Sequence, residues 1–210
     1  MINVLVADDH TIVRRGIIQI INETANMQVI DEVGDGKSAY KRALQNDIDV
    51  LILDVSMPEI TGYDVLGLLS KERPNLPVII LSIYPAKYYA IRFLQAGAMS
   101  YLSKESAPDE LIDAIESVYS GKAYLTEEVS LLLLSQAQNK KVDKLAHELL
   151  SQREFEVMKM IAQGMRSGEI AQKLSLSPKT ISTYRTRILE KLNFSSTADV
   201  IRYTLEHKLI

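Results

Sequence analysis

The chain has 210 residues, of which 47% are hydrophobic and 24% charged, a balance typical of globular protein in one or two domains. No apolar run approaches the roughly 20 residues of a membrane-spanning helix, and the first residues lack the features of a signal peptide. We therefore expect a cytoplasmic protein without a membrane partner. Because the chain lacks cysteine and its three histidines are scattered, we expect that any metal is held by oxygen.

Charge is distributed unevenly along the chain. Residues 1–124 contain 11 basic and 17 acidic side chains, a net charge of −6, whereas residues 148–210 contain 10 and 7, a net charge of +3. This asymmetry favours a cation site in the first part and a surface for a polyanion in the last part.

The first part alternates short β-rich runs with segments of helical periodicity. We expect strands at residues 2–7, 29–33, 50–53, 78–81 and 99–102. The apolar residues between them recur every three or four positions, as on one face of a helix. This alternation predicts an α/β domain with a flavodoxin-like, doubly wound, five-stranded parallel sheet in the order 2-1-3-4-5.

Polar residues directly follow four of these strands. They are Asp8 and Asp9, Asp54, Ser82 and Lys104. In the expected sheet order the carboxyl ends of these strands meet in one crevice, where three carboxylates would repel one another. A hard cation such as Mg²⁺ is the natural neutraliser.

The chemistry that these groups suit is phosphoryl transfer. We expect Asp9, Asp54 and the backbone carbonyl of Ser56 to hold the Mg²⁺ ion. The ammonium of Lys104 and the hydroxyl of Ser82 are groups wanted around a transferred phosphoryl group.

These residues resemble the receiver domain of two-component response regulators over about residues 2–120. The resemblance is carried by the acidic pair, the segment Asp54-Val55-Ser56-Met57-Pro58 with Gly62, Ser82 and the segment Tyr101-Leu102-Ser103-Lys104. It implies that Asp54 accepts a phosphoryl group from a sensor histidine kinase with Mg²⁺ bound, and that Asp9 ligates the metal directly and Asp8 more remotely. It also implies that Tyr101 reorients when Ser82 moves; without it, Tyr101 is an ordinary amphipathic tyrosine at a sheet end.

A phosphatase is the enzymatic alternative for an aspartate in this place. Haloacid-dehalogenase-type phosphatases carry a D-x-D pair whose second aspartate is a general acid, and Ser56 stands at that position here. His10 is expected to be a first-turn residue of a helix instead of an acid. We therefore expect no enzyme beyond the slow self-dephosphorylation of receiver domains.

We expect three parts: a receiver domain at residues 1–122, a linker at 123–146 and a helical domain at 147–210. An apolar run within 126–138 predicts a helix that packs against either domain, and polar residues 139–141 follow it. Helix-capping signals in the last part predict an all-α domain of four helices. These signals are Ser151 with Glu154, Gly164 after the first helix, a second helix at about 167–174, Ser177 before Pro178, an end at about Leu192, and Ser196 with Asp199.

Two short helices joined by a tight turn are typical of a helix-turn-helix, whose second helix enters the major groove of DNA. At 100° per residue, the polar side chains of the third helix lie opposite its apolar stripe. The outward set is Lys179, Ser182, Thr183, Thr186, Arg187 and Glu190. Hydroxyls and arginine suit base edges and lysine suits phosphate, whereas Arg185, near the inward side, is expected to pack its stem and touch a flank. By itself this face is equally a solvated helix surface.

Motif residues in this part resemble the LuxR-type helix-turn-helix of NarL/FixJ-like response regulators. They are Leu150-Ser151-x-Arg153-Glu154, Ile161-Ala162-x-Gly164, Glu169-Ile170-Ala171, Leu174, Ser177-x-Lys179-Thr180-Ile181 and Lys191-Leu192. The resemblance implies a transcriptional regulator that dimerises on phosphorylation and binds double-stranded promoter DNA, with RNA polymerase as a further partner. The alternative is a receiver-type module whose helical domain binds protein.

Overall fold

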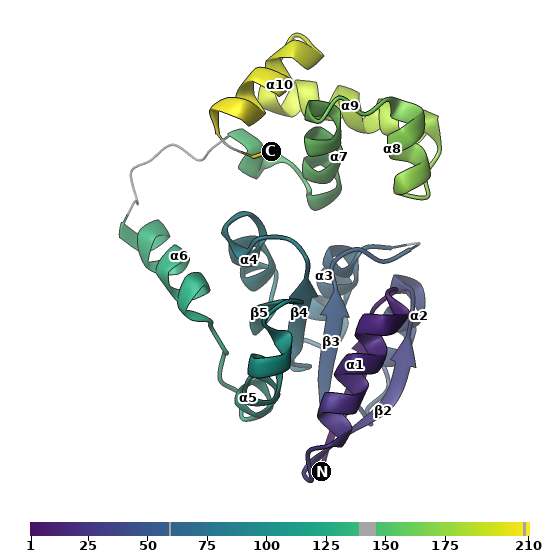
Figure 1. The fold of residues 1–210 in the computed structure, drawn as a ribbon, viewed down its shortest axis with the longest axis vertical. Helices are drawn as coiled ribbons and strands as arrows, with labels where there is room; N and C mark the ends of the chain where they lie inside the picture. The colour runs from purple at the N-terminus through teal and green to yellow at the C-terminus, as the bar shows by residue number, and fades with distance from the viewer. Residues whose placement is uncertain (59, 139–145, 208) are drawn as a thin grey trace. The chain divides into compact units, whose positions relative to one another are not determined.

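The computed structural model describes residues 1–58, 60–138, 146–207 and 209–210, and the chain forms two compact units, Met1–Lys140 and Lys141–Ile210. Each unit is described by itself (Figure 1). The predicted polar segment at 139–141 lies outside the described residues. Within the described ranges, no helix is both long and apolar enough to cross a membrane.

A five-stranded parallel sheet forms the centre of the first unit. Its strands are β1 (Ile2–Ala7), β2 (Met27–Val33), β3 (Val50–Asp54), β4 (Val78–Ser82) and β5 (Ser100–Ser103). They pair in the order β2-β1-β3-β4-β5, which confirms the predicted topology. Asp54 and Ser82 belong to their strands as last residues, because the backbone pairing continues one residue beyond the apolar runs.

Helices cover both faces of this sheet, as a doubly wound fold requires. They are α1 (Thr11–Asn22), α2 (Gly36–Ala43), α3 (Gly62–Glu72), α4 (Ala86–Gln95) and α5 (Ala107–Tyr119). Helices α1 and α5 pack side by side on one face, where Ile17, Ile21, Leu111 and Ile115 are buried against alternate strand residues. Helices α2, α3 and α4 are associated with the other face of the sheet (Figure 1).

The helix expected within residues 126–138 is α6 (Glu127–Gln138), and it packs against α4 within the first unit. The hydroxyl of Thr126 accepts the backbone N–H of Val129 at 3.3 Å, as at other helix starts. Val129 is 1% exposed, so a single apolar side chain anchors the first turn of α6.

The second unit is helical throughout its described part. It contains a 3₁₀ turn η1 (Ala146–Leu149) and helices α7 (Gln152–Ala162), α8 (Ser167–Lys173), α9 (Pro178–Leu192) and α10 (Thr197–Glu206). The two predicted capping boxes, Ser151 with Glu154 and Ser196 with Asp199, are both present. Gly164 follows α7 with a φ of +82°, a conformation that glycine adopts without strain.

Gly62 sets the close approach of α3 to the end of β3. Its backbone N–H donates to the carbonyl of Val55 at 3.0 Å, and a Cβ added here would lie 2.1 Å from the carbonyl oxygen of Asp54. Real Cβ atoms do not come so near to backbone oxygen, so only glycine allows the turn that follows the strand.

We expect Gly62→Ala to destabilise the first unit by more than about 2 kcal/mol, because backbone must shift to relieve the contact. Gly67→Ala in the same helix is the matched control, since nothing lies within 4 Å of its added Cβ. That control should gain about 0.5–1 kcal/mol from helix propensity. Urea unfolding followed by circular dichroism measures both; equal stabilities for the two variants would contradict the clash.

Candidate functional site

The outward face of α9 in the second unit carries the polar residues predicted for it. Lys179, Ser182, Thr183, Thr186, Arg187 and Glu190 are all exposed. The opposite side is held in the core by Ile181, Ile188 and Leu192, which are 1%, 0% and 5% exposed. The predicted division of this helix into a buried stripe and an outward face is therefore confirmed.

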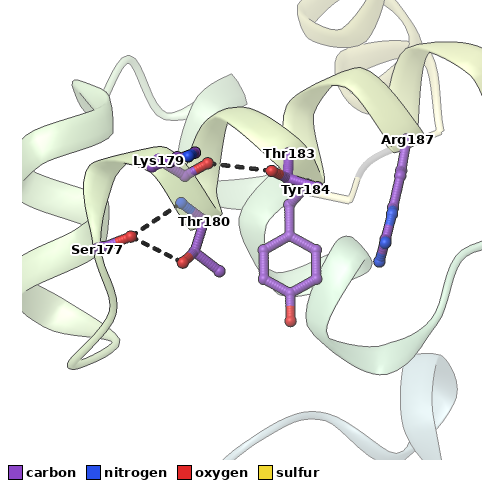
Figure 2. A pocket seen from close by; sticks show the side chains of 6 residues that line it. All are labelled: Ser177, Lys179, Thr180, Thr183, Tyr184 and Arg187. Atoms are coloured by element: carbon purple, nitrogen blue, oxygen red, sulfur yellow. Dashed lines mark hydrogen bonds between the residues drawn. The ribbon is translucent and has the colours of Figure 1, made fainter.

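Three hydroxyls on this face are tied back to the helix itself. Ser182 and Thr183 donate to the carbonyls four residues earlier at 3.1 Å, and Thr186 does so at 3.2 Å. Figure 2 shows the Thr183 bond. Each hydroxyl proton is used in one of these bonds. The hydroxyl oxygens can therefore accept hydrogen bonds from N–H donors on a ligand.

Several of these side chains line one hollow of about 330 Å³ at the start of α9 (Figure 2). The lining residues are Ser177, Lys179, Thr180, Thr183, Tyr184 and Arg187. The hollow combines a lysine and an arginine with hydroxyls and no carboxylate, so its chemistry suits an anionic, hydrogen-bonding polymer such as DNA.

Arg185 lies beside the outward face of α9 and contacts α10. It is exposed, and its guanidinium donates to the hydroxyl of Thr197 at the start of α10. This bond is consistent with the predicted contact at a flank, and the packing of the Arg185 stem stays a prediction. Arg185 therefore stands at a flank of the outward face.

An ion pair fixes α9 to α7. Lys191 Nζ lies 2.6 Å from Glu154 Oε2, and Glu154 is 2% exposed. Burial acts to raise the pKa of the Glu154 carboxyl, but hydrogen bonds from Lys191 and Ser151 outweigh it and hold that pKa below its usual value. The capping box that begins α7 thus also positions the last turn of α9.

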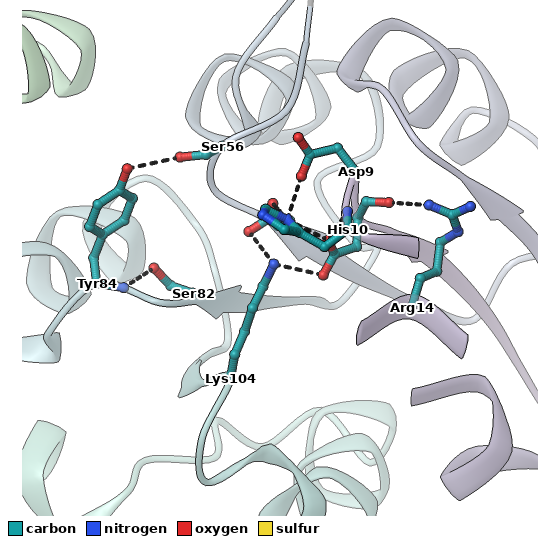
Figure 3. A network of polar contacts seen from close by, with 9 residues as sticks. Asp9, His10, Arg14, Ser56, Ser82, Tyr84 and Lys104 are labelled. Atoms are coloured by element: carbon teal, nitrogen blue, oxygen red, sulfur yellow. Dashed lines mark hydrogen bonds and ion pairs between the residues drawn. The ribbon is translucent and has the colours of Figure 1, made fainter. Parts of the chain in front are cut away.

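The second candidate site lies at the carboxyl edge of the sheet in the first unit. Asp8 and Asp54 are 1% and 2% exposed, and the ammonium of Lys104 sits between them. Its Nζ atom is 2.8 Å from Asp8 Oδ2 and 3.1 Å from Asp54 Oδ1 (Figure 3). The backbone N–H of Lys104 donates to the carbonyl of Ser82 at 2.8 Å, which brings these strand ends together as predicted.

His10 joins this group, although the sequence analysis treated it as an ordinary helix residue. It is the N-cap of α1, makes no side-chain cap bond, and turns its ring toward the carboxylates (Figure 3). His10 Nδ1 lies 2.7 Å from Asp9 Oδ1 and 3.3 Å from Asp8 Oδ1. Its position directly after the acidic pair was the available signal.

Burial and charge together disfavour the ionised form of Asp54. Burial raises the pKa of its carboxyl to about 6, the neighbouring Lys104 ammonium opposes that rise, and the Asp8 carboxylate adds to it. The positive charge of Lys104 alone therefore does not offset the cost of burying the Asp54 carboxylate beside Asp8.

The residues present fit a divalent cation. Three carboxylates and one ammonium leave two negative charges, and the buried Asp54 Oδ2 atom has no hydrogen-bond partner among the described residues. One ligand atom from each of Asp8, Asp9, His10 and Asp54 lies within 4.8 Å of the others. Carboxylate oxygens at such separations are the ligands that Mg²⁺ uses in proteins. The backbone carbonyl of Ser56 stays a predicted further ligand.

Tyr84, which was not among the predicted site residues, connects the predicted switch residues Ser82 and Tyr101. The backbone N–H of Tyr84 donates to Ser82 Oγ at 3.0 Å, and the Tyr101 hydroxyl donates to the Tyr84 carbonyl at 2.9 Å. The Ser56 hydroxyl donates to the Tyr84 hydroxyl at 3.2 Å (Figure 3). Tyr101 is 1% exposed, and burial raises the pKa of its hydroxyl.

We expect Asp54→Asn to stabilise the metal-free protein at neutral pH. The raised pKa means that the folded protein holds this proton more tightly than the unfolded chain does, so wild-type stability falls as the pH rises from about 4 to about 6. The neutral amide of asparagine removes this loss, so the free energy of unfolding should rise by about 1–3 kcal/mol at pH 7.5. Lys104 keeps Asp8 as its ion-pair partner in the variant.

Thermal unfolding with a chelator at pH 5 and pH 7.5 measures the difference. Asp113→Asn, at an exposed aspartate of α5, is the control and should change stability little at either pH. A lower stability of Asp54→Asn than of wild type at pH 7.5 would show that the buried charge is already compensated.

Comparisons with known proteins cover nearly the whole chain. Residues 4–116 match the response regulator receiver domain family, and residues 148–204 match the bacterial regulatory proteins of the luxR family. Response regulator UvrY of Escherichia coli K12 is 36% identical over 100% of this chain and 96% of its own length. Oxygen regulatory protein NreC of Staphylococcus carnosus is 33% identical over 99% of this chain and 98% of its own.

Solved structures agree with these matches. RcsB from Salmonella enterica serovar Typhimurium, bound to promoter P1flhDC in the presence of the phosphomimetic BeF₃⁻, is 29% identical and has a TM-score of 0.60. The similarity covers 96% of this chain and 97% of that one. The acidic crevice lies within the receiver match and the outward face of α9 within the luxR match. The chain therefore belongs to the two-component response regulators that join a receiver domain to a LuxR-type helix-turn-helix DNA-binding domain.

Proposed function

We propose that Asp54 is the phosphoacceptor of this response regulator and that a sensor histidine kinase supplies the phosphoryl group. The observation that carries the proposal is the contact of the buried Asp54 with Lys104 beside two further carboxylates. We assign residues 1–122 to the receiver domain, 123–146 to the linker and 147–210 to the DNA-binding domain.

Each group around Asp54 has a separate role in this proposal. Bound Mg²⁺ supplies the positive charge that lets a phosphoryl group approach the acidic crevice. Asp9, Asp54 and the Ser56 carbonyl hold the ion, and Asp8 supports it from further away while it pairs with Lys104. After transfer, Lys104 and Ser82 contact the phosphoryl oxygens.

Self-dephosphorylation is slow in this proposal, and the protein has no other enzymatic activity. Ser56, two residues after Asp54, cannot act as a general acid. The hydroxyl of Ser56 is instead engaged with Tyr84 at 3.2 Å. No side chain at that position is poised to protonate a leaving group.

Phosphorylation is coupled to the surface through Tyr84 and Tyr101. A phosphoryl group adds about −1.5 to −2 charges at the sheet edge and draws the Ser82 hydroxyl toward it. Ser82 accepts the Tyr84 amide at 3.0 Å and Tyr84 accepts the Tyr101 hydroxyl at 2.9 Å, so the Tyr101 ring must respond. We propose that this change favours a homodimer; the structure of two RcsB dimers bound to two parallel DNAs is a precedent among relatives.

The DNA contacts are proposed on the outward face of α9. Thr183, Thr186 and Arg187 face base edges, Lys179 and Ser182 lie nearer the phosphates, and Arg185 contacts the backbone at the flank. The bound DNA is double-stranded promoter DNA in the cytoplasm, where RNA polymerase is the further partner.

We expect a small-molecule phosphoryl donor to label wild-type protein only with Mg²⁺ present, and the label to be lost in Asp54→Asn and on treatment with hydroxylamine, as for an acyl phosphate. Asp113→Asn should be labelled like wild type. Sedimentation should show dimer formation strengthened by about 5–150-fold, the usual range of such couplings. Labelling that survives chelation or the Asp54 substitution would overturn the proposal.

Substitution of the outward residues of α9 by alanine should weaken DNA binding in ways that differ between positions. Alanine at Thr183, Thr186 or Arg187 should cost about 1–3 kcal/mol at a site found by protection of genomic DNA, and little on random DNA. Alanine at Lys179 should weaken both and reduce the salt slope by about one counterion. Alanine at Glu190 should leave affinity unchanged or raise it, because a carboxylate faces phosphate unfavourably.

Fluorescence anisotropy across a salt series measures all of these variants. The Glu190 variant is the internal control for an exposed position on the same helix. If every variant bound the protected site like wild type, α9 would not be the element in the groove.

A further inference from the structure

The side chain of Arg14, on α1, reaches the loop that carries the acidic pair. Its Nη1 atom donates to the backbone carbonyl of Asp8 at 2.5 Å (Figure 3). Asp8 is 1% exposed, and its carboxylate pairs with Lys104 at 2.8 Å. A charged donor thus holds the main chain of a residue whose side chain takes part in the acidic crevice.

A second element of the fold holds the guanidinium in place. Arg14 Nε donates to Oε2 of Glu32, on β2, at 2.5 Å, so two donors of one planar fork contact two different parts of the fold. The side chain of Arg14 is 16% exposed, and a Cβ added at Gly34 would lie 3.5 Å from its Nη1 atom. The guanidinium is therefore packed against the end of β2.

The contact with Arg14 joins two other bonds that fix Asp8. The backbone N–H of Asp8 donates to the carbonyl of Val33 at 3.1 Å, and Asp8 Oδ1 accepts the N–H of His10 at 2.7 Å. The carbonyl that Arg14 contacts belongs to the peptide group between Asp8 and Asp9. Because a peptide group is planar, a bond that holds its oxygen also sets the direction in which the chain enters Asp9.

We propose that Arg14 is a positioning residue, which holds the peptide between Asp8 and Asp9 so that both carboxylates face the Mg²⁺ site before the ion binds. The inference rests on the proposed function, since that ion accompanies phosphoryl transfer to Asp54. Ligands that are already held in their bound geometry lose less conformational freedom on binding, which raises the affinity for the ion. Because Glu32 balances the charge of Arg14, the effect comes from geometry rather than from an added positive field.

We expect Arg14→Gln to weaken Mg²⁺ binding about tenfold, as for other groups that hold metal ligands from outside. Arg14→Lys should lose a similar amount, because an ammonium keeps the charge but cannot contact Asp8 and Glu32 through one planar fork. Titration calorimetry of the full-length protein measures both variants. Arg15→Gln, at the neighbouring exposed arginine, is the matched control and should bind Mg²⁺ like wild type.

Labelling by a small-molecule phosphoryl donor across an Mg²⁺ series separates positioning from a general loss of structure. The Mg²⁺ concentration that gives half of the maximal rate should rise about tenfold in Arg14→Gln. The rate at saturating Mg²⁺ should stay within about twofold of wild type, because Asp54 and Lys104 are unchanged. A lower saturating rate with an unchanged half-maximal Mg²⁺ concentration would contradict the positioning role.

Hydrogen exchange of the metal-free protein gives a readout that is independent of the ion. The amide of Asp8, which bonds to Val33 at 3.1 Å, should exchange faster in both Arg14 variants than in wild type. Unchanged Mg²⁺ affinity in Arg14→Gln, wild-type affinity in Arg14→Lys, or the same loss in Arg15→Gln would overturn the role of Arg14 and leave the phosphoacceptor proposal intact. Wild type that binds Mg²⁺ without being labelled at Asp54 would overturn the proposed function instead, and calorimetry would still decide the role of Arg14.

Discussion

The burial of Asp54 beside Lys104 is the interaction on which the receiver unit depends. Their contact at 3.1 Å does not balance the crevice, because Asp8 shares the same ammonium at 2.8 Å. Burial raises the pKa of Asp54 to about 6. The fold therefore holds a carboxylate at a free-energy cost, and the proposed metal ion and phosphorylation would both act on that charge imbalance.

Backbone, more than side chains, keeps this arrangement in place. Gly62 brings α3 to within a hydrogen bond of the turn after β3, and a side chain there would strike the Asp54 carbonyl. The Lys104 N–H to the Ser82 carbonyl, at 2.8 Å, fixes the last residues of the neighbouring strands. Central parallel strands are thus the rigid base; Ser82 and Tyr101 belong to β4 and β5, and Tyr84 and Lys104 lie on the loops beyond them.

Sequence reasoning predicted the sheet order, the strand-end cluster and the outward face of α9, because each depends on a regular period or on strand ends meeting at one edge. It did not predict the orientation of His10, the partner of Arg185 or the place of Tyr84. A side chain at the end of a helix or strand has several possible hydrogen-bond partners. Which partner it contacts depends on its neighbours in three dimensions, and the periodicity of the sequence does not contain that information. Tyr84, for example, lies in a loop, yet its amide, carbonyl and hydroxyl all bond to predicted site residues.

The hydrogen bonds of Tyr84 also limit the free energy that the proposed switch could transmit. Each neutral hydrogen bond contributes about 0.5–1.5 kcal/mol, so the bond that Tyr84 donates to Ser82 and the bond that it accepts from Tyr101 together amount to about 1–3 kcal/mol, which matches a typical coupling free energy. A full inversion of a two-state population needs about 5.5 kcal/mol. The remainder must come from a larger surface, and Tyr101 reaches one: it lines a cavity of about 250 Å³ with Thr126, Glu127 and Glu128 at the start of α6. In the proposed switch, rearrangement of α6 against α4 would supply the remainder, because hydrogen bonds near Asp54 alone are too weak.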